Sequence, residues 1–196
     1  MLKGIYIIAG HSQRAKGAKA YNGLYEHHYT TLVQSEMIKL CQAQNIPCKT
    51  DSETMPLSQV VNWIDTTIEQ DWHVLDIHFN YANPNATGVE VFVDPNTTEQ
   101  NKAIASRMVH NFSKEFGYPI RRMESNRDYK YPAESARGQL AMFEGILIEQ
   151  TKPPVILIEC CFLNEQDLSI FDPKRAAQCI LAAYLTPSRN LNLQLC

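Results

Sequence analysis

Three ionisable residues follow short, mainly apolar runs that are typical of buried strands. They are His11 after residues 5–9, His78 after residues 74–77 and Glu159 after residues 155–158. In open α/β sheets, functional groups gather outside the carboxyl ends of the strands, so these side chains are predicted to meet at one edge. A carboxylate that ends an all-apolar strand is costly to bury unless it meets a cation, a proton or solvent. Glu159 is therefore a candidate for chemistry.

A fourth candidate is Glu26, which starts a long predicted helix after a polar loop. Two histidines and one carboxylate form a zinc-ligand set that leaves one position open for water. Zinc lowers the pKa of that water to about 7 and polarises a substrate carbonyl. A carboxylate outside the ligand set can then act as general base. His11, Glu26 and His78 as ligands, with Glu159 as base, would fill every role.

Each candidate also has a purely structural interpretation. A buried histidine is commonly a hydrogen-bonded core residue, and a glutamate at the start of a helix often only interacts with the helix dipole. Glu159 could form a buried ion pair. Cys160 and Cys161 raise a different chemistry, a thiolate nucleophile paired with histidine. Buried cysteine more often behaves as a small apolar residue.

The elements that must position these residues follow from hydrophobic periodicity. Strands are predicted over residues 3–9, 47–50, 73–79, 88–93, 118–121 and 155–159. Helices are predicted over about 24–44, 57–70, 98–116, 136–149 and 173–184. Strands that alternate with helices predict an α/β fold in a single domain, with a twisted, mostly parallel sheet of about six strands flanked by helices on both faces.

Composition excludes several classes of protein. The chain has 196 residues, with 18 basic and 21 acidic side chains and a net charge of −3. That balance argues against a nucleic-acid binder and a basic membrane-surface protein, and no apolar run approaches the ~20 residues of a membrane helix. The first apolar run, residues 5–9, is too short for a signal peptide. The six cysteines are irregularly spaced, which predicts reduced thiols.

Four segments, in order along residues 5–164, together resemble the zinc-dependent N-acetylmuramoyl-L-alanine amidases of the amidase-3 type. They are the strand that leads into Gly10-His11, the glycine-containing loop that ends at Glu26, His78-Phe79-Asn80 with residues 88–92, and residues 154–164 around Glu159. Two of these segments depart from the family pattern. The family's Asp-Pro-Gly-His-Gly-Gly reads Ile8-Ala9-Gly10-His11-Ser12-Gln13, and Cys161 stands where the family has glycine.

The resemblance implies one Zn²⁺ per chain, held by His11, Glu26 and His78, with Glu159 in the catalytic role. It also implies hydrolysis of the amide that joins N-acetylmuramic acid to L-alanine in peptidoglycan, the expected partner. Asn80 and Arg137 are candidate substrate-binding residues, since an arginine can clamp a carboxylate of the stem peptide. No nucleic-acid partner and no membrane insertion are expected, and no immunity or regulatory protein is identifiable.

Residues 1–196 are expected to form one catalytic domain, with residues 185–196 loosely attached and no separate wall-binding domain. Without a visible leader, the protein is expected to be made in the cytoplasm and to act on the cell wall after release or export. A phage endolysin fits this expectation, as do a delivered toxin and a secreted enzyme that lacks its leader here. Two other functions stay open: a zinc peptidase or carboxypeptidase acting within the stem peptide, and a non-catalytic peptidoglycan-binding relative.

Overall fold

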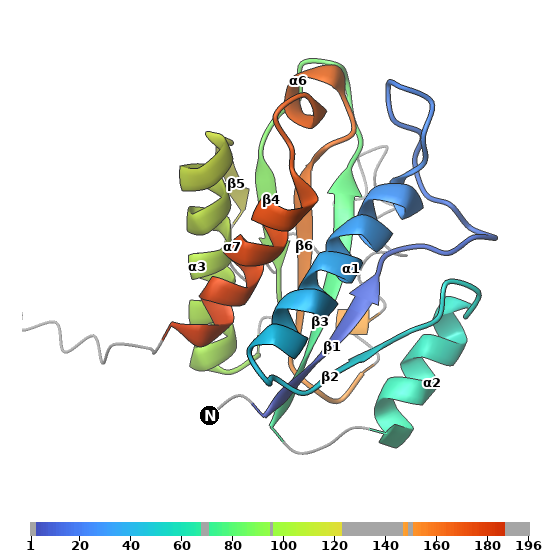
Figure 1. The fold of residues 1–196 in the computed structure, drawn as a ribbon, viewed down its shortest axis with the longest axis vertical. Helices are drawn as coiled ribbons and strands as arrows, with labels where there is room; N and C mark the ends of the chain where they lie inside the picture. Colours follow the sequence, from blue (N-terminus) through green and yellow to red (C-terminus); the bar gives the residue numbers. More distant parts are fainter. Residues whose placement is uncertain (1–2, 68–70, 95, 123–146, 149–150, 187–196) are drawn as a thin grey trace, which may run out of the picture.

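The computed structural model describes residues 3–67, 71–94, 96–122, 147–148 and 151–186. Its strands are β1 (Gly4–Ala9), β2 (Cys48–Thr50), β3 (Trp72–Asn80), β4 (Val89–Phe92), β5 (Ile120–Arg122) and β6 (Val155–Phe162) (Figure 1). Its helices are α1 (Glu26–Ala43), α2 (Leu57–Thr67), α3 (Glu99–Phe116), α6 (Glu165–Leu168) and α7 (Pro173–Leu185). Arg137, most of the predicted helix 136–149 and the tail beyond residue 186 lie outside the described residues.

The described strands form one sheet in the order β2-β1-β3-β6-β4-β5. Every neighbouring pair is parallel except β4 and β6, which run antiparallel. All residues of β1, β3 and β6 are buried, as expected for central strands covered on both faces. The predicted α/β fold with a mostly parallel, six-stranded sheet is confirmed.

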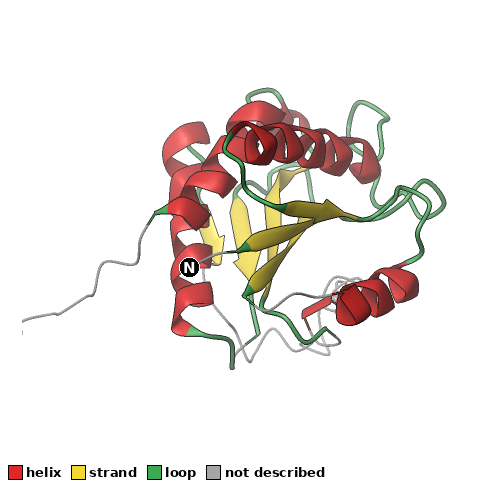
Figure 2. Cartoon of the chain, turned by 60° about the horizontal axis from the view of Figure 1, so that its bottom comes forward, coloured by secondary structure: helices red, strands yellow, loops and turns green. Residues whose placement is uncertain are grey.

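Helices cover both faces of this sheet (Figure 2). On one face, Ile5 and Ile7 belong to a core built with side chains of α1, α3 and α7. On the other face, Tyr6 and Ile8 pack in a second core with Val60 and Ile64 of α2. Because side chains alternate along a strand, the central strands β1, β3 and β6 each contribute to both cores.

The same alternation decides on which face the polar residues of the central strands lie. Ile8 pairs with Asp76 on the neighbouring strand, so Asp76 lies on the face that packs against α2. His78 follows two residues later on that face, and it pairs with Glu159 of β6. The polar end of this face is therefore built from two adjacent parallel strands.

Two strands extend beyond their predicted ends. The predicted strand 73–79 continues by one residue to Asn80, and the predicted strand 155–159 continues to Phe162, so neither His78 nor Glu159 ends its strand. The pairing shifts between His78–Glu159 and Asn80–Phe162, which places one extra residue in β6. Strand pairing uses backbone groups, so a polar side chain does not end it.

The described cysteines are free, as predicted, and no disulfide joins Cys41, Cys48, Cys160, Cys161 or Cys179. In the same part of the chain, no helix is both long and apolar enough to cross a bilayer.

Candidate metal centre

His11 is placed by a sharp turn directly after β1. Its backbone has a φ of 70°, in the left-handed region that a non-glycine residue seldom adopts. Before it, the N–H of Gly10 donates to the carbonyl of Ile77 at 2.8 Å, which ties the turn to β3. The imidazole of His11 consequently lies beside that of His78, with ring centroids 5.1 Å apart.

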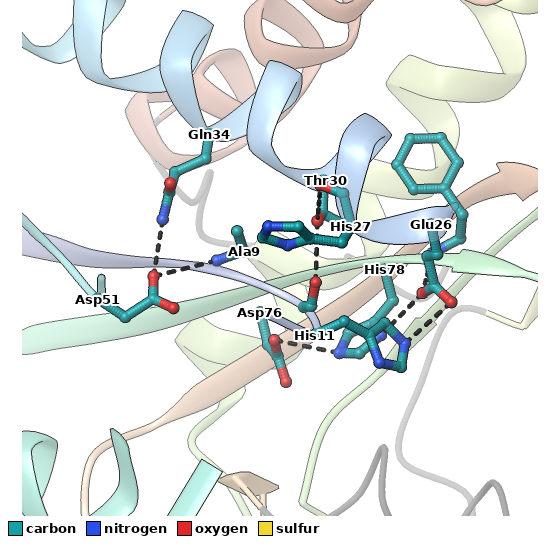
Figure 3. A network of polar contacts seen from close by, with 11 residues as sticks. Ala9, His11, Glu26, His27, Thr30, Gln34, Asp51, Asp76 and His78 are labelled. Atoms are coloured by element: carbon teal, nitrogen blue, oxygen red, sulfur yellow. Dashed lines mark hydrogen bonds and ion pairs between the residues drawn. The ribbon is translucent and has the colours of Figure 1, made fainter. Parts of the chain in front are cut away.

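Glu26 is the first residue of α1, and its carboxylate lies between the two histidines (Figure 3). Oε2 is 2.9 Å from Nε2 of His11, and Oε1 is 3.1 Å from Nδ1 of His78. The backbone N–H of Phe79 donates to Oε1 at 3.0 Å. Glu26 is only 4% exposed, so these contacts replace the water that an ionised carboxylate requires.

His11, Glu26 and His78 can offer one ligand atom each, and these three atoms lie within 4.8 Å of one another. Two imidazole nitrogens and one carboxylate oxygen are the donor types that a divalent transition metal prefers. The structure thus brings together the three residues that the sequence predicted as ligands, in an arrangement that fits a metal ion.

The charges of this cluster are strongly coupled. Burial alone would raise the pKa of Glu26, but hydrogen bonds and positive charge from His11 and His78 hold that pKa well below its usual range. Burial alone would lower the pKa of His78, but Asp76 and Glu26 raise it well above the usual value. Since metal ligands must lose their protons, a metal at this cluster would compete with protonation and would bind more weakly as the pH falls.

The side chains of His11, Glu26 and His78 occupy space that is open only because two neighbouring residues are glycines. A Cβ at Gly10 would lie 2.5 Å from Cε1 of His78. A Cβ at Gly17, where φ is +73°, would lie 2.5 Å from Cδ2 of His11 and 2.6 Å from Oε2 of Glu26. Real Cβ atoms do not approach this closely, so the ligands would have to move.

We expect Gly17→Ala to weaken metal binding, because the added methyl group displaces the His11 ring and the Glu26 carboxylate. Gly23→Ala is the matched control: its φ is +88°, but its Cβ would meet nothing closer than 3.9 Å. Both variants pay a backbone cost on the order of 1 kcal/mol for alanine at positive φ. Metal titration of the two should separate them, and equal affinities would show that the ligands adjust freely.

Glu159 lies next to this cluster on the same face of the sheet. It is 2% exposed, and its neighbours across the ladder are His78 on β3 and Glu90 on β4. Asn80 donates from Nδ2 to Oε2 of Glu90 at 3.0 Å, and Arg121 donates from Nε to Oε1 of Glu90 at 2.7 Å. Sequence reasoning singled out Glu159 and Asn80 but missed this role of Arg121, which charge-compensates Glu90.

The thiol alternative finds no support among the described residues. Cys160 and Cys161 are both fully buried in the core on the α1, α3 and α7 side of the sheet, away from the face that carries Glu159. Burial raises the pKa of both thiols well above the usual value, which disfavours the nucleophilic thiolate. Consecutive residues of a regular strand point to opposite faces, and the extra residue in β6 is the reason that Cys160 and Cys161 both lie in the same core.

Asp51 and Asp76 are two further acidic residues near the centre that the sequence did not single out. Asp51 accepts from Nε2 of Gln34 at 2.8 Å and from the N–H of Ala9 at 3.3 Å (Figure 3). Burial, with a contribution from the charge of Asp76, raises the pKa of Asp51 from 3.8 to about 6. Asp76 lies against His78, with Oδ1 3.3 Å from Nε2. Its position two residues before His78 in a strand is the signal that could have revealed it.

The raised pKa of Asp51 gives a testable pH dependence. Ionisation of this carboxyl opposes folding, so its contribution to stability is full below pH 3.8 and is lost as the pH rises through about 6. Asp51→Asn keeps an oxygen that accepts both hydrogen bonds and removes the titration. We expect this variant to gain up to about 3 kcal/mol over the natural protein at pH 8 and nothing at pH 3.5, measured by denaturant unfolding. An equal gain at both pH values would contradict this origin.

A cavity of about 680 Å³ opens among loops that leave the carboxyl ends of β1, β3 and β6. Two exposed tyrosines, Tyr21 and Tyr81, line it, with exposed fractions of 55% and 57%. The other lining residues are Lys19, Ala20, Ala82, Pro84, Phe162, Leu163, Asn164, Glu165 and Gln166. His11 follows β1, and His78 and Glu159 lie near the carboxyl ends of β3 and β6, so the cavity lies at the edge of the sheet that holds the site.

A family model described as N-acetylmuramoyl-L-alanine amidase matches residues 5–183 of the chain. Among solved structures, an N-acetylmuramoyl-L-alanine amidase from Clostridium difficile 630 aligns with a TM-score of 0.73 at 17% identity, over 94% of this chain and 95% of that one. The catalytic domain of the amidase CwlV from Bacillus (Paenibacillus) polymyxa var. colistinus aligns with a TM-score of 0.71 at 21% identity, over 93% and 96%.

The catalytic domain of the CD27L endolysin, which targets Clostridia difficile, aligns with a TM-score of 0.72 at 14% identity, over 93% of this chain and 97% of that one. A search of curated protein sequences found no match. At these identities the structural likeness establishes the fold, while the family match over residues 5–183 bears on the activity.

Proposed function

This chain belongs to the N-acetylmuramoyl-L-alanine amidase family and is an enzyme of peptidoglycan hydrolysis, and from that premise we propose that its metal is zinc and that four of its residues carry the reaction. His11, Glu26 and His78 hold one Zn²⁺ per chain, and Glu159 is the general base. The bond cleaved is the amide between the lactyl group of N-acetylmuramic acid and L-alanine.

The observation that carries this proposal is the position of Glu26 between two histidines. All three ligand atoms lie within 4.8 Å of one another, and Glu159 is the ladder neighbour of His78. The set contains three protein ligands, which is the number typical of catalytic rather than structural zinc sites. A buried carboxylate next to such a set is placed to exchange a proton with a water molecule or a leaving group.

When bound, zinc supplies a Lewis acid that polarises the scissile carbonyl and lowers the pKa of water to about 7. Glu159 accepts the proton of the attacking water at its carboxylate. The protonated Glu159 then donates that proton to the nitrogen of L-alanine as the carbon–nitrogen bond breaks. The products are a free lactyl carboxylate on the sugar and a peptide with a free L-alanine amino group, so one water molecule is consumed.

Asn80 is proposed to contact the stem peptide. Its Nδ2 is held by Glu90, which orients the amide so that Oδ1 can accept an N–H from the substrate. Arg137 lies outside the described residues and stays a prediction as the partner of a stem-peptide carboxylate.

The substrate lies outside the cytoplasmic membrane, so we propose that the protein acts on the wall after release or export. Its similarity in fold to the catalytic domain of an endolysin supports a bacteriolytic role of this kind.

The test combines metal analysis with digestion of purified peptidoglycan, with and without a chelator. We expect about one zinc per chain, and chelator-sensitive release of peptides that begin with L-alanine, restored when zinc is added back. Release of peptides or amino acids cut within the stem would instead establish the peptidase alternative. Binding to peptidoglycan without any released peptide would establish the non-catalytic alternative.

A further inference from the structure

Asp76 is a buried carboxylate that the reaction proposed above does not use. It lies on β3 two residues before His78, on the same face of the sheet, and is 3% exposed. Its Oδ1 is 3.3 Å from Nε2 of His78 (Figure 3). In the described part of the chain no hydrogen bond reaches this oxygen, and the Nε2 atom of His78 is its ion-pair partner. A carboxylate oxygen left without a donor in the interior is costly, so the imidazole is the group that can stabilise it.

The two ring nitrogens of His78 face different partners. Nδ1 is directed at the ligand cluster, 3.1 Å from Oε1 of Glu26, whereas Nε2 is directed at Asp76. A neutral imidazole that binds a metal through Nδ1 carries its hydrogen on Nε2. That hydrogen is then carried by the nitrogen that lies 3.3 Å from Oδ1 of Asp76, and the carboxylate can accept it.

The ring of His78 is also confined from the side of β1. A Cβ at Gly10 would lie 2.5 Å from Cε1 and 2.6 Å from Nε2 of this ring, so the edge of the imidazole lies directly against the backbone of the turn that follows β1. Asp76 and Gly10 therefore act on the same edge of the ring, one by a polar contact and the other by packing.

We propose that Asp76 is a positioning residue for the metal centre: it accepts the Nε2 hydrogen of His78, and thereby selects the tautomer and ring orientation that present Nδ1 to the metal. This inference rests on the metal centre described above. Carboxylates that hold a metal-binding histidine in this way also make the imidazole a better ligand, and their removal typically costs 10–100-fold in metal affinity.

The direct test measures zinc affinity of the metal-free protein by competition with a coloured chelator, without any substrate. We expect Asp76→Ala to bind zinc about 10–100-fold more weakly than the natural protein. Asp76→Asn, which keeps an acceptor but loses the charge, should fall between the two. Asp51→Asn is the matched control, because Asp51 contacts Ala9 and Gln34 but none of the three ligands, and its zinc affinity should stay within about twofold.

A second measurement separates positioning from a merely structural role. In the zinc-bound protein with ¹⁵N-labelled histidine, the resonances of His78 should show a hydrogen on Nε2 and a metal on Nδ1. Asp76→Asn, the milder variant, should weaken this signature while its thermal unfolding stays close to that of the natural protein.

The outcomes distinguish this inference from the proposed function. If the natural protein binds zinc and both Asp76 variants bind it as tightly, the role of Asp76 is wrong and the metal centre stands. A natural protein that binds no zinc overturns both. If Asp76→Ala does not fold, the test rests on the zinc affinity and the His78 resonances of Asp76→Asn. If both equal those of the natural protein, the inference is wrong.

Discussion

Glu159→Gln is expected to abolish peptidoglycan hydrolysis while leaving about one zinc per chain. Glutamine has the shape of glutamate but cannot accept the proton of the attacking water. Loss of a general base costs roughly 10²–10⁴-fold in rate. The proposed ligands are His11, Glu26 and His78, so the metal should remain. Release of L-alanine-terminated peptides, measured together with metal content on the same preparation, checks both halves of the prediction.

The control for this variant is Glu115→Gln. Glu115 pairs with Arg175 on the surface, with 42% of its side chain exposed, and this substitution should leave both activity and metal unchanged. Loss of zinc from Glu159→Gln would identify Glu159 as a ligand. Activity close to that of the natural protein would exclude it as the base.

His78→Ala is expected to lose both metal and activity. The variant removes one of three ligands, and it also removes one of the two histidines that hold the buried carboxylate of Glu26 in its ionised form. The zinc affinity of a centre with two protein ligands should be at least about 100-fold lower. Loss of a residue that only orients a ligand already lowers metal affinity by about 10–100-fold. Metal content after dialysis, with peptidoglycan digestion in added zinc, measures the two losses.

His28→Ala is the control for this second variant. His28 lies on α1 two residues after Glu26, is exposed, and is not one of the three clustered residues. It should keep its metal and its activity. A His78→Ala protein that holds zinc as tightly as the natural one would remove His78 from the ligand set, and with it the role inferred for Asp76.

Most of the described elements were predictable because their apolar patterns are unambiguous. The predicted strand 3–9 is found as Gly4–Ala9, and the predicted helix 98–116 as Glu99–Phe116. The helix Glu165–Leu168 was missed, because four residues are too few to show a 3.6-residue period. This short helix is instead stabilised by an N-terminal cap: the side-chain oxygen of Asn164 accepts a hydrogen bond from the N–H of Asp167 at 2.9 Å.

The sequence by itself determined which residue types can do chemistry here. His11, His78 and Glu159 were identifiable as candidates because polar side chains in apolar strand segments must meet a partner, and Glu26 was a candidate as a carboxylate at a helix start. Hydrophobic alternation likewise determined the layered α/β architecture, since burial of each strand on two faces needs helices on both.

Only the tertiary structure decided how these groups face one another. Which nitrogen of His78 points at Glu26 and which at Asp76 depends on side-chain orientation and on the approach of Gly10, neither of which is local in sequence. The extra residue in β6 depends on its pairing with β3, and it turns Cys161 away from the site into the core. Sequence patterns report burial and period, whereas a metal site depends on distances between atoms that different strands and a helix bring together.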